Sequence, residues 1–163
     1  MSREGYLGLG SNVGDRLAHL RAAREGLERR DIRVLAASMV YETEPVGEVL
    51  EQRDFLNACV EVATELTPDA LLERCKELEG ELGRRAGTAR HGPRVIDVDI
   101  LLLDGIERAD GRLTLPHPGV LERRFVALPL VELDPAIELP DGTLVARALE
   151  RLDGQRVEPV GPL

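Results

Sequence analysis

Residues 95–103 constrain the fold of this chain more than any other stretch. Every residue in the run is apolar except Asp97 and Asp99, and side chains two apart on a strand point to the same face. The run therefore predicts a strand with both aspartates on one face. The opposite face is apolar and is made by Ile96, Val98, Ile100 and Leu102.

Two carboxylates on one strand face suit a hard cation. At a rise of about 3.3 Å per residue, the Cα atoms of Asp97 and Asp99 lie on the order of 6–7 Å apart. Such a pair resists joint ionisation unless a positive charge compensates it, and Mg²⁺ prefers carboxylate oxygens as ligands. An edge strand with a solvated polar face has the same pattern, so the strand alone leaves metal binding open.

Arginines gather directly before this strand. Residues 82–96 contain four arginines and no acidic residue, in a chain of net charge −9. The planar guanidinium fork matches phosphate oxygens, and carboxylate-held metal beside such a cluster is typical of a nucleoside triphosphate site. The four are Arg84, Arg85, Arg90 and Arg94.

Length and composition narrow the class of protein. At 163 residues and 43% hydrophobic content, the chain suits a single catalytic domain over 1–163. It lacks an apolar run long enough for a membrane span, and its two cysteines fit reduced, buried thiols. A pI near 4.9 with 2% aromatic residues argues against nucleic-acid binding. We therefore expect a cytoplasmic protein with no membrane or nucleic-acid partner. We also expect a monomer, although none of these features bears on the oligomeric state.

The apolar periodicity predicts an α+β fold of the ferredoxin-like type, an antiparallel sheet with helices packed on it. The expected order is strand, helix, strand, strand, helix, strand. These elements cover residues 5–10, 15–29, 32–43 and 55–62, a helix that Thr67 caps, and residues 95–103.

The remaining segments are expected to be shorter or irregular. The glycines of residues 8–14 fit a tight turn, since neither phosphate-loop pattern is matched. Towards the C-terminus we expect a short strand, two helices and a loose tail, over residues 113–115, 121–133, 143–152 and 153–163.

Several blocks of the sequence resemble one family. The segment GPRVIDVDIL, residues 92–101, resembles the signature of 6-hydroxymethyl-7,8-dihydropterin pyrophosphokinases. Further blocks agree in order and spacing, so the resemblance covers roughly residues 5–140. They are YLGLGSN (6–12), YETEPVG (41–47), DFLN (54–57) and LPHP (115–118).

The resemblance implies both a reaction and a set of site residues. Diphosphate passes from ATP to the hydroxymethyl group of the pterin in folate biosynthesis, and AMP leaves. Asp97 and Asp99 would hold Mg²⁺, as two ions, while Arg84 and Arg94 would be catalytic. The implied nucleotide-binding residues are Glu79, Arg84, Arg94, Ile100, Arg112, Thr114, His117 and Arg123. The implied pterin-binding residues are Thr43, Pro45, Val46, Phe55, Asn57 and Phe125.

The residues themselves support parts of this assignment. The strand at 55–62 alternates so that Phe55 and Asn57 share one face. The paired donor and acceptor of Asn57 suit a pterin edge, although a solvated strand end is the alternative. His117 lies between two prolines. Glu79 borders the apolar stripe of its helix, where a solvated ion pair with Lys76 is the alternative.

Two other functions remain open from the sequence. A Mg²⁺-dependent kinase of another small alcohol would release ADP instead of AMP. A non-catalytic ferredoxin-like binding module would not need Arg84, Arg94, Asp97 and Asp99 together.

Overall fold

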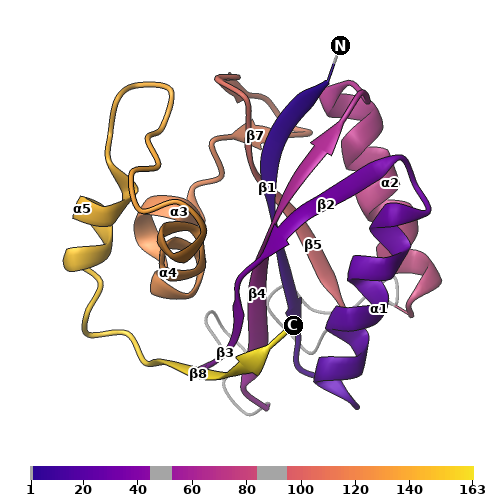
Figure 1. Cartoon of the computed structure of the whole chain (residues 1–163), viewed down its shortest axis with the longest axis horizontal. Helices are drawn as coiled ribbons and strands as arrows, with labels where there is room; N and C mark the ends of the chain where they lie inside the picture. Colours follow the sequence, from indigo (N-terminus) through magenta and orange to yellow (C-terminus); the bar gives the residue numbers. More distant parts are fainter. Residues whose placement is uncertain (1, 45–52, 84–94) are drawn as a thin grey trace.

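The computed structural model describes residues 2–44, 53–83 and 95–163 (Figure 1). In this part of the chain six strands form one sheet in the order β5-β1-β4-β3-β8, with β2 also paired to β4. Every pairing is antiparallel. The strands are β1 (Arg3–Ser11), β2 (Ile32–Ala37), β3 (Met39–Thr43), β4 (Phe55–Thr64), β5 (Asp97–Leu103) and β8 (Val157–Pro162).

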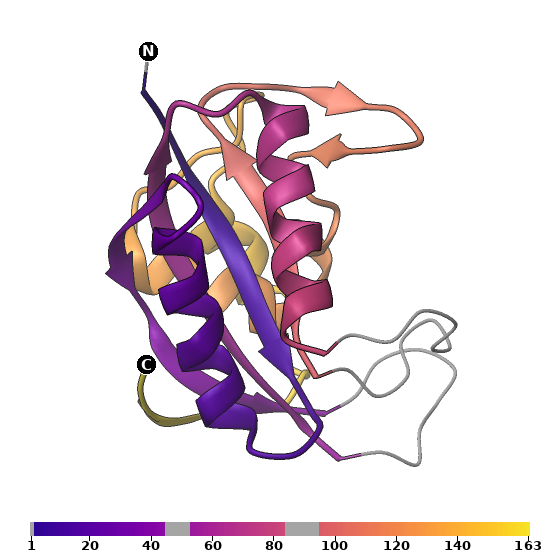
Figure 2. The same cartoon turned by 90° about the vertical axis from the view of Figure 1, so that its right-hand side faces the viewer.

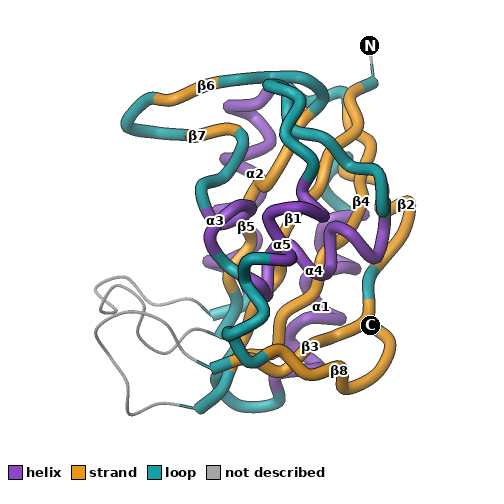
Figure 3. Tube along the Cα trace, turned by 90° about the vertical axis from the view of Figure 1, so that its left-hand side faces the viewer, coloured by secondary structure: helices purple, strands orange, loops and turns teal. Residues whose placement is uncertain are grey.

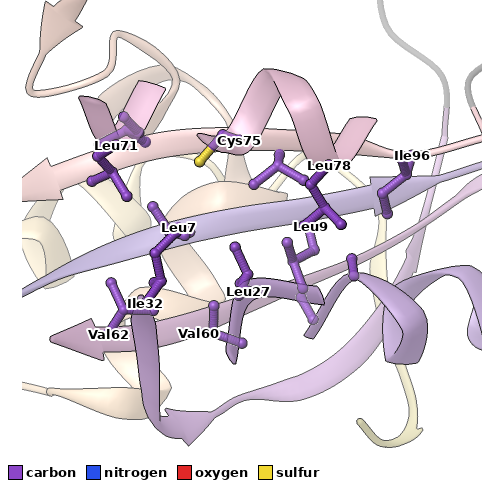
Figure 4. Packing of buried hydrophobic residues seen from close by; sticks show 14 of the residues in the cluster. Leu7, Leu9, Leu27, Ile32, Val60, Val62, Leu71, Cys75, Leu78 and Ile96 are labelled. Atoms are coloured by element: carbon purple, nitrogen blue, oxygen red, sulfur yellow. The ribbon is translucent and has the colours of Figure 1, made fainter. Parts of the chain in front are cut away.

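Two helices cover one face of the sheet, as Figure 2 shows: α1 (Arg16–Glu28) and α2 (Pro68–Glu81). Both begin where the sequence predicts, because Asp15 and Thr67 accept hydrogen bonds from backbone amides of the first turn. Their apolar stripes bury the main core against β1 and β4 (Figure 4). The ferredoxin-like α+β fold is therefore confirmed, and its core elements follow in the order β1-α1-β2/β3-β4-α2-β5.

Three shorter helices lie on the opposite face of the sheet (Figures 1 and 3). They are α3 (Gly119–Glu122), α4 (Arg124–Leu133) and α5 (Val145–Glu150), and a hairpin of β6 (Arg108–Ala109) and β7 (Thr114–Leu115) precedes them. Leu101, Val120 and Leu130 belong to a second core between this layer and the sheet. None of the described helices is both long and apolar enough to span a membrane.

The expected strand 32–43 is two strands, because Ser38 interrupts it. The backbone N–H of Ser38 donates to the carbonyl of Cys59 at 2.9 Å, and its hydroxyl accepts from the N–H of Cys59 at 2.9 Å. A buried side chain thus replaces one rung of the ladder, and the chain turns from β2 into β3.

The prediction that Leu102 shares the apolar face of β5 with Ile96, Val98 and Ile100 is wrong. The register with β1 shifts between Tyr6 and Leu7, so that these residues face Leu102 and Ile100. Leu101 is the additional residue of this bulge, and Leu101 and Leu102 both join the second core.

The C-terminal part differs most from expectation. The helix expected over 121–133 is α3 and α4, because Arg123 is extended between them with φ −127° and ψ 120°. The closing helix is limited to α5. Residues 153–163 are not a loose tail, since Val157–Pro162 forms β8 and pairs with β3.

Candidate active-site cleft

A cleft of about 300 Å³ opens between the sheet and the α3–α4 layer. Its walls come from the ends of β3, β4 and β5 on one side and from the segment 117–126 on the other. Eight of the residues predicted for the site line it: Thr43, Phe55, Asn57, Asp97, Asp99, His117, Arg123 and Phe125.

Two glycines of β1 form part of the floor of the cleft. Gly8 and Gly10 lie within β1, as expected for residues 5–10, and not in the turn that was expected for the glycines of residues 8–14. Of these glycines only Gly14 has a positive φ, +65°. A Cβ atom at Gly10 would lie 2.8 Å from the Oδ1 atom of Asn57, closer than atoms pack. These glycines therefore keep the floor free of side chains.

The aspartates face the cleft from the edge strand. Gly10 pairs with Asp97 and Gly8 with Asp99, so no side chain of β1 lies beside either carboxylate on this face. The carboxylate of Glu79, whose residue is only 6% exposed, accepts a hydrogen bond of 2.8 Å from the N–H of Val98. Glu79 thus anchors the backbone between the two aspartates. Lys76, its partner in the alternative of a solvated ion pair, is exposed.

An amide and two phenylalanines line the other part of the cleft. The Nδ2 group of Asn57 donates to the Thr43 hydroxyl at 2.7 Å, and both residues are buried. Phe55 comes from β4 and Phe125 from α4, on opposite walls. The guanidinium carbon of Arg123 lies 5.9 Å from the centre of the Phe125 ring, within the range of a cation–π contact.

His117 is held by two backbone contacts. The backbone N–H of His117 donates to the carbonyl of Leu101 at 2.9 Å, and the ring atom Nδ1 accepts from the backbone N–H of Gly119 at 2.9 Å. In the neutral ring the proton is therefore on Nε2. Burial lowers the pKa of His117 below 6.5, and the nearby Arg123 charge lowers it further.

The lowered pKa of His117 makes the protein lose stability in acid. The unfolded chain binds a proton on His117 below about pH 6.5, whereas the folded protein keeps the ring neutral to lower pH. The contribution of His117 to the free energy of unfolding is therefore fully present above pH 6.5, and it is lost as the pH falls through the pKa of His117 in the folded protein. An NMR titration should give a His117 midpoint below 6.5, assigned by the signal missing in His117→Gln. A midpoint at or above 6.5 would contradict it.

Other predicted residues lie elsewhere or outside the described residues. Among the described residues Ile100 is buried in the main core, and Thr114 is exposed on β7. Arg112 donates to Glu73 at 2.9 Å and lies 3.6 Å from Asp69 on α2, instead of lining the cleft. Arg84, Arg94, Pro45 and Val46 fall outside the described residues.

Several residues that line the cleft were not predicted from the sequence: Gly8, Gly10, Glu44, Cys59, Leu101 and Val126. Only the glycines had a usable signal, because their spacing of two places both on one face of a strand.

Comparison with known proteins gives a consistent result. The profile of the family 7,8-dihydro-6-hydroxymethylpterin-pyrophosphokinase (HPPK) matches residues 6–135. The 2-amino-4-hydroxy-6-hydroxymethyldihydropteridine pyrophosphokinase of Methylorubrum extorquens is 48% identical over 95% of this chain and 97% of its own length. The protein of the same name from Bacillus subtilis is 42% identical over 85% of this chain and 82% of its own.

The fold has a counterpart among solved structures. The wild-type HPPK-DHPS of Plasmodium falciparum with pteroate superposes with a TM-score of 0.71 at 14% identity. The match covers 93% of this chain and 42% of that longer chain, so it supports the fold. Together with the profile match over residues 6–135, the two bacterial relatives show that the chain belongs to the 7,8-dihydro-6-hydroxymethylpterin pyrophosphokinase family.

Proposed function

We propose that this chain transfers diphosphate from ATP to the hydroxymethyl oxygen of 6-hydroxymethyl-7,8-dihydropterin, releasing AMP, and that the cleft is where the transfer occurs. Membership of the family makes the chain an ATP-dependent diphosphotransferase. The observation that carries the assignment of the cleft is its composition: the acidic pair Asp97 and Asp99 lines the same space as Asn57 and the two phenylalanines.

The acidic pair fits Mg²⁺. Asp97 and Asp99 offer carboxylate oxygens to the cleft from one strand, which is the donor type that Mg²⁺ takes when it also binds phosphate oxygens and water. Among the described residues no group of three or more His, Cys, Asp and Glu side chains could hold a metal ion by itself. Mg²⁺, proposed as two ions, would enter with ATP and neutralise charge on its phosphates.

The pterin is proposed to lie between Phe55 and Phe125 with its edge towards Asn57. Opposed aromatic rings favour a flat heterocycle, and the amide of Asn57 supplies the paired polar atoms that such an edge needs. Thr43 holds this amide in place through the 2.7 Å hydrogen bond. The hydroxymethyl oxygen would then face the β-phosphorus of ATP in line with the departing AMP.

Positive and polar groups near the acidic pair would stabilise the transferring diphosphate. Arg123 and His117 line the cleft, and the Nε2 proton of His117 can donate to a phosphate oxygen. Arg84 and Arg94 remain proposed catalytic residues on the basis of the family resemblance. Glu79, Ile100, Arg112 and Thr114 remain proposed nucleotide-binding residues. Pro45 and Val46 remain proposed pterin contacts.

The setting of the reaction is also a proposal. We propose a cytoplasmic monomer with no nucleic-acid or membrane partner. The acidic composition supports the absence of a nucleic-acid partner, and Cys59 and Cys75, both free and buried, support the cytoplasmic location. Buried thiols without a disulfide fit a reducing compartment.

The product nucleotide tests the reaction. The protein is incubated with Mg-ATP and 6-hydroxymethyl-7,8-dihydropterin, and the nucleotides are separated by ion-exchange chromatography. We expect AMP in equal amount to the pterin diphosphate, and none without the pterin. ADP would indicate a simple kinase, and unchanged ATP would indicate a binding module; either result overturns the proposal.

A further inference from the structure

Two adjacent residues near the C-terminus, Gln155 and Arg156, bond to opposite walls of the cleft. We propose that they form a tie that fixes the separation of the two walls, and thereby of Phe55 and Phe125. Both are positioning residues, since neither lines the cleft among the described residues. The inference rests on the proposed function, because the ligand whose binding the tie is proposed to support is the pterin.

Gln155 holds the wall made by α3 and α4. Its Oε1 atom accepts from the N–H of Arg124 at 2.9 Å, and its Nε2 group donates to the carbonyl of Glu122 at 3.0 Å. The Arg124 guanidinium also donates to the carbonyl of Gln155 at 3.0 Å. These bonds enclose Arg123, the extended residue at which the two helices separate, and they act on the residue directly before Phe125.

Arg156 holds the wall made by β3 and β4. Its Nη2 group donates to the Asp54 carboxylate at 2.5 Å, and its Nε group donates to the Glu44 carboxylate at 3.1 Å. Glu44 directly follows β3 and lines the cleft, and Asp54 directly precedes Phe55. The two contacts use two different nitrogens of one planar guanidinium, Nε and Nη2, whose fixed spacing a lysine ammonium does not reproduce.

The tie is rooted in the sheet. The next residue, Val157, begins β8 and pairs with Thr43 of β3, and Thr43 in turn accepts the hydrogen bond of Asn57. Figure 1 shows how the chain runs from α5 on one side of the molecule to β8 beside β3. One short segment therefore connects the helical wall, the sheet wall and the strand that supports the amide.

The separation of two rings matters for a flat ligand between them. Dispersion contacts lose about a quarter to a half of their strength when a gap widens by about 0.5–1 Å. Releasing one end of the tie should therefore weaken pterin binding. Exposed ion pairs change an equilibrium by up to about fivefold each, so we expect the KM for the pterin to rise about three- to tenfold.

The test compares Gln155→Ala, Arg156→Ala and the double variant with wild type. We expect each single variant to raise the KM for the pterin while kcat stays within about twofold, because the reacting groups are untouched. The double variant should exceed neither single variant by more than about twofold, since a tie released at one end is already lost. Arg156→Lys should raise the KM for the pterin less than Arg156→Ala does, because lysine keeps the positive charge. Arg151→Ala, an exposed arginine outside the cleft, is the matched control.

The dissociation constant for 6-hydroxymethyl-7,8-dihydropterin, measured by its fluorescence with a non-hydrolysable ATP analogue, separates this inference from the proposed function. Wild type that binds the pterin without releasing AMP sinks the proposed function but leaves the tie measurable by affinity. The tie is overturned if both alanine variants bind the pterin within about twofold of wild type, or if their shift equals that of Arg151→Ala. It is also overturned if the wild-type protein binds no pterin. A circular-dichroism spectrum confirms that each variant is folded.

Discussion

Replacing Asp97 or Asp99 with asparagine should lower kcat/KM for diphosphate transfer about 10²- to 10³-fold. Asparagine keeps the size of the side chain but removes the charge that would hold Mg²⁺ against the triphosphate. Losing one such electrostatic contact in an active site costs about 3–4 kcal/mol of transition-state stabilisation. Because both side chains lie at least partly in solvent, the free energy of unfolding should change by less than about 1 kcal/mol.

AMP release at saturating pterin, followed as Mg²⁺ is raised, measures the effect. The variants should need more Mg²⁺ for half-maximal rate, which a general loss of folding would not produce. Asp104→Asn is the matched control, because Asp104 follows β5, accepts a hydrogen bond from the N–H of Glu4 and lies outside the cleft. Wild-type Mg²⁺ dependence and rate in both cleft variants would falsify the assignment of the acidic pair.

Replacing Asn57 with leucine should lower kcat/KM for the pterin about 10²-fold and leave the KM for ATP unchanged. Leucine has nearly the same shape but cannot pair with a polar ring edge, and a substrate group left unpaired in a dry site costs about 1–3 kcal/mol. The variant should also lose about 1–2 kcal/mol of stability, because the buried Thr43 hydroxyl loses its partner at 2.7 Å.

The double variant Asn57→Leu/Thr43→Val separates the two effects. Removing both members of a buried hydrogen bond is close to neutral, so urea unfolding should show stability recovered towards wild type. Steady-state kinetics should show no recovery of kcat/KM, since the polar atoms that would meet the pterin are still absent. Recovery of activity together with stability would mean that Asn57 serves only the fold.

Local patterns predicted the elements of the ferredoxin-like core well. Period two in residues 55–62 and 95–103 placed Asn57 and the two aspartates on cleft-facing sides of their strands, because alternation is a property of the strand alone. Thr67 marked the start of α2 because capping involves neighbours along the chain, and the start expected for α1 at residue 15 agrees with the Asp15 cap that the structure shows. The family resemblance, not periodicity, proposed which of these residues meet the nucleotide and the pterin.

Features that depend on distant partners were not predicted. Ser38 divides a strand because Cys59, 21 residues away, bonds to its hydroxyl. The bulge in β5 is set by its register with β1. Residues 153–163 carry no periodic pattern of their own, and Val157–Pro162 within them forms β8 by pairing with β3.

The sequence by itself determined the core strands and helices and the faces on which their polar residues lie, since these follow from spacing along the chain. Only the tertiary structure decided that α3 and α4 close a cleft over the glycine floor of β1, and that Gln155 and Arg156 join its walls. The contact between Arg156 and Glu44 joins residues 112 apart. Such a contact exists only after the sheet has assembled, because no local preference brings the two side chains together.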